Sequence, residues 1–205
     1  MDILQKLKNN QRRIGLTGGI ASGKTTITNY IRKHKNIPIL DADNLSKDLI
    51  KPNTYGYTKI LEYFGNQIID NKNNLEKTID RKLLRNIIFK NSKSKEWIEK
   101  LLHPLIKEKM ILECSQYKNN QTILMVIPLL FEANFEDICT EIWLVKCPRE
   151  TQKKRLIVRD KISEKEAYET INFQLSFEEK TKLSDIILDN SEDQNKWINS
   201  IKELL

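Results

Sequence analysis

Residues 18–26 (GGIASGKTT) have the types and spacing needed to bind phosphate groups. They contain the pattern G-x-x-x-x-G-K-[ST], with Gly18, Gly23, Lys24 and Thr25 at its defining positions. Glycines let the backbone curl so that several N–H groups point inward at phosphate oxygens. A lysine in this place reaches the β- and γ-phosphates, and a threonine hydroxyl can ligate Mg²⁺. The pattern therefore predicts a site for a nucleoside triphosphate and its magnesium ion.

The flanks of this segment indicate a phosphate loop between a strand and a helix. Residues 13–17 (RIGLT) predict a buried strand, and residues 25–35 predict an amphipathic helix. The free N–H groups and the dipole of such a helix favour anions. The alternative is a glycine-rich turn that binds nothing, but the strand, lysine and hydroxyl together favour the phosphate site. We expect ATP to contact Gly18, Gly19, Ile20, Ala21, Ser22, Gly23, Lys24, Thr25 and Thr26.

A second pair of candidate residues, Asp41 and Asp43, lies at the end of the apolar run at residues 37–41 (IPILD). On a strand, the i, i+2 spacing would direct both carboxylates the same way. Ligands of open α/β sheets bind beyond the carboxyl ends of the strands, where this pair falls. Asp43 would then orient or deprotonate an acceptor hydroxyl, and Asp41 could assist through a magnesium-bound water. The alternative is a pair that caps the following helix, since aspartate is a good N-cap.

The rest of the sequence narrows the class of nucleotide-binding protein. It has neither the N-K-x-D nor the D-x-x-G element of regulatory GTPases. The apolar run at residues 123–127 continues into Pro128 without an acidic residue, which counts against a motor or helicase. The best class is a small-molecule kinase for a nucleoside, a nucleotide or another metabolite. A basic nucleic-acid-binding protein regulated by ATP ranks last: the net charge of +7 suits it, but no helix-turn-helix signature or aromatic-interleaved basic stripe is visible.

Five short apolar runs predict strands that are buried on both faces. They are residues 13–17, 37–41, 123–127, 141–146 and 185–189. Helical stretches separate them, so the alternation predicts an α/β fold with a mainly parallel, five-stranded sheet as its P-loop nucleotide-binding core.

Two long intervals between these runs predict helical additions to the core. Helical signals occur at residues 80–90, 95–102 and 104–117, and Pro104 suits the first turn of the last of these helices, directly after His103. The interval after the fourth run is crowded with Arg and Lys, as a closing lid would be. We expect one domain with a core at residues 12–50, 120–147 and 181–205, a helical substrate lobe at about 51–119 and a lid at about 148–180.

Composition sets further expectations for the whole chain. Its 205 residues suit one compact domain. Three cysteines without C-x-x-C spacing and only two histidines argue against a disulfide framework or a zinc site, and favour a reducing cytoplasm. The longest apolar run, residues 123–131, is too short to span a bilayer, and the first residues are too polar for a secretory signal. We expect a cytoplasmic monomer or small homo-oligomer without a nucleic-acid or membrane partner.

Further motifs follow the phosphate loop and DAD in order along the chain. They are FG at residues 64–65, DRKLLRNIIF at 80–89, HPLI at 103–106, PLLFE at 128–132, RLIVRD at 155–160 and ILDNS at 187–191. The collinear series, from about residue 13 to 191, resembles the dephospho-CoA kinase family. The resemblance implies ATP-dependent phosphorylation of the ribose 3′-hydroxyl of dephospho-CoA, the last step of coenzyme A synthesis. It also implies a core, a helical substrate lobe and a lid.

The resemblance assigns roles to residues at the matching positions. Asp43 corresponds to the family's catalytic aspartate, and Lys24 would neutralise charge on the phosphates. Arg155 and Arg159, at i and i+4 on a predicted helix, would clamp the transferred phosphoryl group. The alternative for the two arginines is a solvated helix face on which Asp160 pairs locally.

Other positions in the motifs are candidates for substrate or nucleotide contacts. Arg81 could meet the substrate's phosphates or pair with Asp80 or Glu76, and His103 could line the substrate pocket or be structural. Asn190 could lie near the adenine. Lys47 stands where related chains often have Arg, so a bidentate phosphate contact there is in doubt. Trp97 and Trp143 are expected in the core rather than as cofactor platforms.

Overall fold

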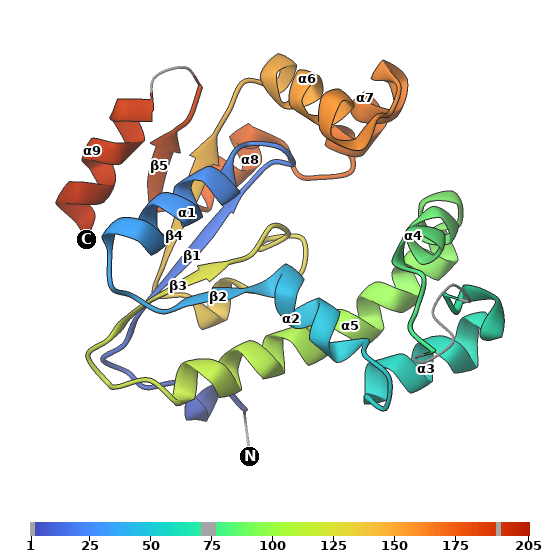
Figure 1. Cartoon of the computed structure of the whole chain (residues 1–205). Helices are drawn as coiled ribbons and strands as arrows, with labels where there is room; N and C mark the ends of the chain where they lie inside the picture. Colours follow the sequence, from blue (N-terminus) through green and yellow to red (C-terminus); the bar gives the residue numbers. More distant parts are fainter. Residues whose placement is uncertain (1–2, 71–76, 192–193) are drawn as a thin grey trace. The chain divides into compact units, whose positions relative to one another are not determined.

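The computed structural model describes residues 3–70, 77–191 and 194–205 (Figure 1). Within these residues one all-parallel sheet has the strand order β2-β3-β1-β4-β5. Its strands are β1 (Arg12–Gly18), β2 (Ile39–Asp41), β3 (Thr122–Val126), β4 (Glu141–Lys146) and β5 (Ile186–Asp189). The predicted fold class and all five predicted strands are confirmed, with bounds that differ by at most two residues.

The central strand of the sheet is β1, which carries the candidate phosphate loop at its carboxyl end. It pairs with β3 from Arg12↔Thr122 onward and with β4 from Ile14↔Glu141 onward. Because all five strands are parallel, their carboxyl ends share one edge of the sheet. The loop that follows β1 therefore lies at the edge where ligands of open α/β sheets bind.

The core of the sheet is covered on one face by α1 (Lys24–His34) and α9 (Gln194–Leu204), which lie together in Figure 1. Ile27 and Ile31 of α1 are completely buried, as the predicted apolar stripe of that helix requires. Trp143, predicted as a core residue, is also completely buried. These residues belong to one buried hydrophobic cluster, which comprises Ile14, Leu16, Ile27, Ile31, Leu124, Val126, Trp143, Val145, Leu188, Trp197 and Ile201.

The chain divides into two compact units, one of residues 1–41 with 113–205 and one of residues 42–112. The second unit contains α2 (Ala42–Leu49), α3 (Tyr55–Phe64), α4 (Arg81–Lys90) and most of α5 (Ser92–Ser115). It has its own core, formed by Ile50, Ile60, Phe64, Ile68, Ile79, Leu84 and Ile98. Trp97 packs against this cluster and stacks on Tyr63 with ring centroids 4.0 Å apart, so it too is structural.

Helix α5 corrects the sequence prediction of two helices at residues 95–102 and 104–117. It is one continuous helix with Pro104 inside it. A proline in a helix interior removes one backbone hydrogen bond and crowds the preceding turn, which is why it was expected to mark a helix start. His103 therefore lies in the middle of a long helix and not before the first turn of a new one.

The chain between β4 and β5 forms three short helices, which belong to the first unit. They are α6 (Arg149–Asp160), α7 (Glu164–Asn172) and α8 (Phe177–Lys182). Helices α7 and α8 each begin with a capping box, in which a serine hydroxyl accepts from the backbone of a glutamate three residues on and that glutamate binds back. The serines are Ser163 and Ser176, and their local bonds fix where both helices start.

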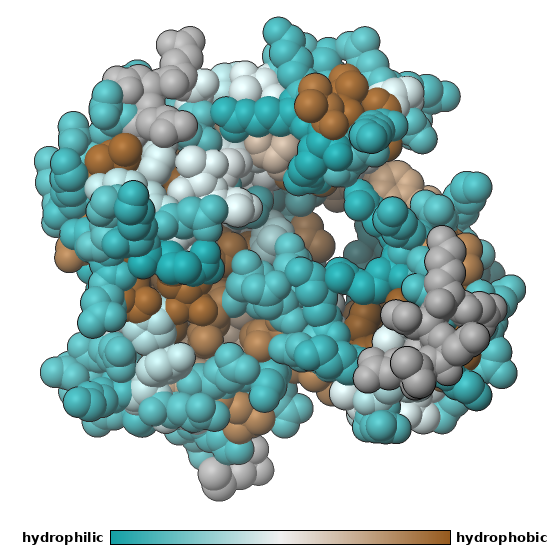
Figure 2. Space-filling model, viewed as in Figure 1, coloured by the Kyte–Doolittle hydropathy of each residue, from teal (hydrophilic) through white to brown (hydrophobic). Residues whose placement is uncertain are grey.

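The surface is predominantly polar on the face drawn in Figure 2, where hydrophobic residues appear only in smaller patches. Among the described residues, no helix is long and apolar enough to span a membrane, and no group of His, Cys, Asp and Glu could hold a metal ion. Cys114, Cys139 and Cys147 are free thiols. Burial raises the pKa of Cys114 and of Cys139 to about 12, so both stay protonated at neutral pH.

Candidate functional site

The loop after β1 curls through three residues with positive φ: Gly18 at 150°, Ala21 at 58° and Gly23 at 100°. Glycine is needed at position 18, because a Cβ there would lie 2.8 Å from the carbonyl oxygen of Val145 on β4. Inside the loop the amide of Ser22 donates to the carbonyl of Gly19 at 3.1 Å. The segment therefore has the tight, curled backbone that the glycines predicted.

The ammonium group of Lys24 reaches back over this curl. Its Nζ donates to the carbonyl oxygens of Gly18 at 2.7 Å and Gly19 at 3.0 Å. Thr25 is exposed in the first turn of α1. The helix starts after Gly23, and no side chain among the described residues caps it. Positive charge, a hydroxyl and a helix N-terminus thus meet at one place, which is the arrangement that binds a polyphosphate.

Asn190, the residue directly after β5, supports this loop. Its Nδ2 donates to the carbonyl of Ser22 at 2.8 Å, and its Oδ1 accepts from the indole N–H of Trp197 at 3.1 Å. A Cβ on Gly23 would lie 2.0 Å from the same Nδ2, so that glycine gives the amide group room. Asn190 is thus a buried brace of the phosphate loop, and its predicted position near the adenine stays a prediction.

The two arginines of α6 are used differently. Nη1 of Arg155 lies 3.4 Å from the carbonyl of Ala21 and 3.5 Å from that of Ser22, so its guanidinium is at the phosphate loop. Arg159 makes a bidentate pair with Asp160, at 2.7 and 3.0 Å. This pair raises the pKa of Arg159. In this structure only Arg155 contacts the loop, whereas Arg159 has the local partner that was the alternative.

The DAD segment differs from the prediction that both carboxylates lie on one strand. Asp41 is the last residue of β2, but the next residue already belongs to α2, and Asp43 is exposed in its first turn. The i, i+2 argument therefore fails, because the backbone changes from extended to helical between the two aspartates. Asp43 is in a position where a carboxylate complements the helix dipole.

The other predicted substrate residues belong to the second unit. Arg81 is the exposed first residue of α4, and Asp80 before it accepts from two backbone N–H groups as the N-cap of that helix. Glu76, the other suggested partner of Arg81, lies outside the described residues. His103 is half-buried in α5, and burial lowers its pKa. Lys47 is exposed in the last turn of α2, where its Nζ donates to Asn44 at 3.1 Å.

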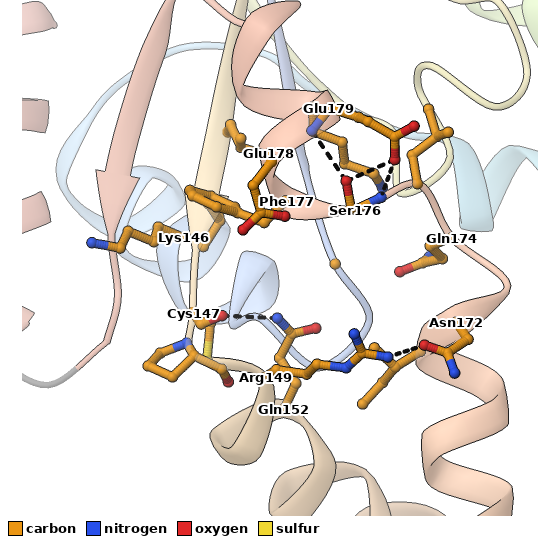
Figure 3. Close-up of a pocket in the computed structure, with 17 residues that line it drawn as sticks. Lys146, Cys147, Arg149, Gln152, Asn172, Gln174, Ser176, Phe177, Glu178 and Glu179 are labelled. Carbon is orange, nitrogen blue, oxygen red and sulfur yellow. Dashed lines mark hydrogen bonds between the residues drawn. The ribbon is translucent and has the colours of Figure 1, made fainter.

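A cavity of about 620 Å³ adjoins the phosphate loop at Gly19 in the first unit. It is bounded by the end of β4, the start of α6, the link between α7 and α8, and α8 itself (Figure 3). Figure 3 shows the amide side chains of Gln152 and Gln174 pointing into it from two sides, with the guanidinium of Arg149 below them. Arg149 pairs with Asn172 and lies over the ring of Tyr168, 4.9 Å from its centroid.

Gln152 and Gln174 are residues that the sequence analysis missed. The amide of Ile20 donates to Oε1 of Gln174 at 2.7 Å. Gln152 is buried and donates to the carbonyl of Cys147 at 2.8 Å, and a Cβ on Gly19 would lie 2.5 Å from its Oε1. A glutamine in a basic helical segment looks like a solvated residue, so the sequence carried no signal for either. The capping box at Ser176 marked only where the following helix starts.

Comparisons with known proteins agree with this geometry. The family model described as dephospho-CoA kinase matches residues 12–196. A protein of Prochlorococcus marinus (strain MIT 9312) named dephospho-CoA kinase is 86% identical over 205 residues, which is 100% of both chains. A solved dephospho-CoA kinase from Campylobacter jejuni is 28% identical, with a TM-score of 0.67 over 95% of this chain and 97% of that one. A Thermus thermophilus structure has the same fold, with a TM-score of 0.79 at 24% identity, over 96% of this chain and 97% of its own.

Proposed function

The chain belongs to the dephospho-CoA kinase family, and from this premise we propose which of its residues perform the reaction. The protein uses ATP to phosphorylate the ribose 3′-hydroxyl of dephospho-CoA, giving CoA and ADP in the final step of coenzyme A biosynthesis. The curled backbone after β1, with Lys24 folded over it, is the observation that carries the assignment of residues.

In our proposal the phosphate loop binds the triphosphate of ATP. Amides of the loop and of the first turn of α1 would hold the phosphates, and Lys24 would exchange its two carbonyl contacts for phosphate oxygens. Phosphoryl transfer has a loose transition state, so positioning and charge neutralisation supply most of the catalysis. Arg155, already beside the loop carbonyls, is the better candidate for contacting the transferred group.

Arg159 could take part only if it leaves Asp160. We propose that residues 148–180 form a lid over the loop and that this exchange accompanies its closure. The support is the basic helix α6, whose Arg155 lies 3.4 Å from the carbonyl of Ala21 in the loop. The core at residues 12–50, 120–147 and 181–205 and the substrate lobe at about 51–119 belong to the same proposal.

We propose Asp43 as the group that orients and deprotonates the acceptor hydroxyl. Support comes from the DAD motif and from an exposed carboxylate two residues after the end of β2. Arg81 and His103 would contact dephospho-CoA. Asn190 would act on ATP through the loop that it braces, with the adenine contact remaining a prediction.

Mg²⁺ is the ion that we propose for this site. It prefers oxygen ligands, and the exposed hydroxyl of Thr25 in the first turn of α1 fits that preference. Asp41, at the end of β2, offers a carboxylate that could act through a bound water. When bound, Mg²⁺ neutralises charge on the phosphates.

Other expectations about the protein stay predictions. These are its cytoplasmic location, its state as a monomer or small homo-oligomer, and the absence of a nucleic-acid partner. The three free cysteines are consistent with a reducing compartment.

The reaction is tested with purified protein, ATP, Mg²⁺ and dephospho-CoA, with formation of ADP and CoA as the measurement. A panel of nucleosides and nucleotides as acceptors separates this activity from that of a related kinase. We expect ADP to form when dephospho-CoA is the acceptor and not when a nucleoside or nucleotide replaces it. A folded, ATP-binding sample that phosphorylates another acceptor and leaves dephospho-CoA unchanged would contradict the assignment.

Substitution of the proposed base tests the role of Asp43. We expect Asp43→Asn to lower kcat by more than about a hundredfold, because general acid–base catalysis contributes at least that much. Nucleotide affinity should be retained. Asp48→Asn is the matched control, since it makes the same change at an exposed position of the same helix. A near-normal kcat for Asp43→Asn would remove this residue from the catalytic role and leave the kinase activity intact.

A further inference from the structure

A residue from outside the phosphate loop binds its backbone at Ile20, which we call the crest of the loop. Ile20 lies between Gly19 and the left-handed Ala21, and its amide donates to Oε1 of Gln174 at 2.7 Å. Gln174 belongs to the link between α7 and α8, more than 150 residues further along the chain. One loop amide that could meet a phosphate is therefore bound to the protein itself, at a distance typical of a strong hydrogen bond.

A buried ion pair fixes the link that carries Gln174. Lys180 is only 1% exposed, and its Nζ lies 2.8 Å from Oε1 of Glu132. The same carboxylate oxygen accepts from the backbone N–H of Leu175, the residue next to Gln174, at 3.0 Å. Glu132 ends the PLLFE motif after β3, to which the reaction assigns no role. Burying a charged pair is costly, so such a pair is often kept for the position that it specifies.

The chain after Gln174 is fixed as well. Ser176 starts α8 with a capping box to Glu179, whose carboxylate accepts from the Ser176 backbone at 2.9 Å and from its hydroxyl at 2.7 Å. The backbone is thus held at Leu175 and again at Ser176. Because the backbone on the carboxyl side of Gln174 is fixed, its side-chain oxygen is kept within hydrogen-bond distance of the Ile20 amide.

We propose that Gln174 is a positioning residue for ATP, held on the crest of the phosphate loop by the Glu132–Lys180 pair. Its role rests on the proposed function of the loop. The side chain supplies an acceptor oxygen without a charge. A carboxylate in the same place would also accept from Ile20, but it would add negative charge beside the triphosphate. This explains why an amide group suits the position.

Direct measurement of nucleotide binding tests the proposal. Because no acceptor substrate is present, the result does not depend on which acceptor the enzyme uses. The dissociation constants of ATP and ADP with Mg²⁺ are measured by calorimetry for the full-length protein. We expect Gln174→Ala to weaken binding by about 2- to 10-fold, the effect of one hydrogen bond. Gln174→Glu should weaken it more at low salt, and the difference between these two variants should shrink as salt is added. Gln116→Glu makes the same change at an exposed position and should bind normally.

Kinetics and a second variant separate positioning from a general structural effect. In Gln174→Ala the KM for ATP should rise while the KM for dephospho-CoA stays unchanged. The neutral double variant Glu132→Gln/Lys180→Met should weaken ATP binding to a similar degree, and adding Gln174→Ala to it should cause little further loss, because all three residues act through one contact. Circular dichroism confirms that each variant is folded.

Two results would overturn the proposal. Unchanged nucleotide affinity in folded Gln174→Ala would show that the contact with Ile20 does not position the loop for ATP. Tighter binding in that variant would mean that Gln174 competes with the phosphates for the amide of Ile20, which is the opposite role.

Discussion

At Asn190 a single amide side chain makes two hydrogen bonds in a buried place. It donates to the phosphate loop at Ser22 and accepts from Trp197 of the covering helix α9. The loop is therefore connected through one residue to the hydrophobic core below it. A change at this position should alter stability as well as nucleotide binding.

The substitution Asn190→Asp removes the donor and keeps the acceptor. The carbonyl of Ser22 would lose its donor at 2.8 Å and face a carboxylate, so we expect the free energy of unfolding to fall by about 1–3 kcal/mol. Urea unfolding measures this change. Asn199→Asp, at an exposed position of α9, is the control and should stay close to the wild type. Equal stabilities for the two variants would contradict the bracing role.

At the scale of single residues, the sequence predicted the parts of the site that lie in one local motif. Lys24 and Thr25 stand at fixed spacing from the glycines, so their roles follow from the pattern alone. Gln174 and Gln152 reach the loop from more than 130 residues away, and only the fold brings them there. Neither residue type has a local pattern that distinguishes this use from a solvated helix face.

Helix α5 shows how a local rule fails within a larger element. The helix continues through Pro104 although that residue has no N–H to donate. The packed residues on both sides of the proline, such as Ile98 and Met110, are buried along its length. Burial of these side chains offsets the backbone cost of the proline.

This explanation predicts that the proline lowers the stability of the helix. We expect Pro104→Ala to raise the free energy of unfolding by about 1–3 kcal/mol, since a proline inside a helix costs up to about 3 kcal/mol relative to alanine. Urea unfolding is the measurement. Glu108→Ala, at another exposed position of α5, should change stability much less. A lower stability for Pro104→Ala would mean that the proline fits a bend that the alanine helix does not adopt.

The strands were easier to predict than the helix boundaries. Each strand is a short run of apolar residues buried on both faces, and such runs are distinct in the sequence. The preferred interpretation placed Asp43 on a strand, whereas α2 follows β2 without a loop. The alternative, in which the aspartates cap the following helix, had the right backbone change, because aspartate is a common residue at a helix start.

The whole molecule has two compact units, each with a separate hydrophobic cluster. The phosphate loop belongs to the unit of residues 1–41 and 113–205. A ligand that binds only the folded form of this unit stabilises it by mass action. Nucleotide should therefore raise the free energy of unfolding of the unit that contains the phosphate loop.

We expect MgADP at about 100 times its dissociation constant to raise the free energy of unfolding by about 2.7 kcal/mol. Urea titrations with and without nucleotide measure this increase. If the two units unfold in separate steps, only the step of the first unit should shift. Lys24→Ala should lose the increase, because its ammonium group contacts the phosphates in our proposal. An equal increase in that variant would place the nucleotide elsewhere.

The position of β1 in the sheet has a consequence for synthesis on the ribosome. Its neighbours begin at Thr122 and Glu141, so both partners of the central strand are translated after the whole second unit. At about 5–20 residues per second the nascent β1 waits roughly 5–20 s with both of its edges unpaired. Its apolar residues Ile14 and Leu16 are exposed to other chains during that delay. Among the five strands of the sheet, β1 therefore waits longest for its first partner.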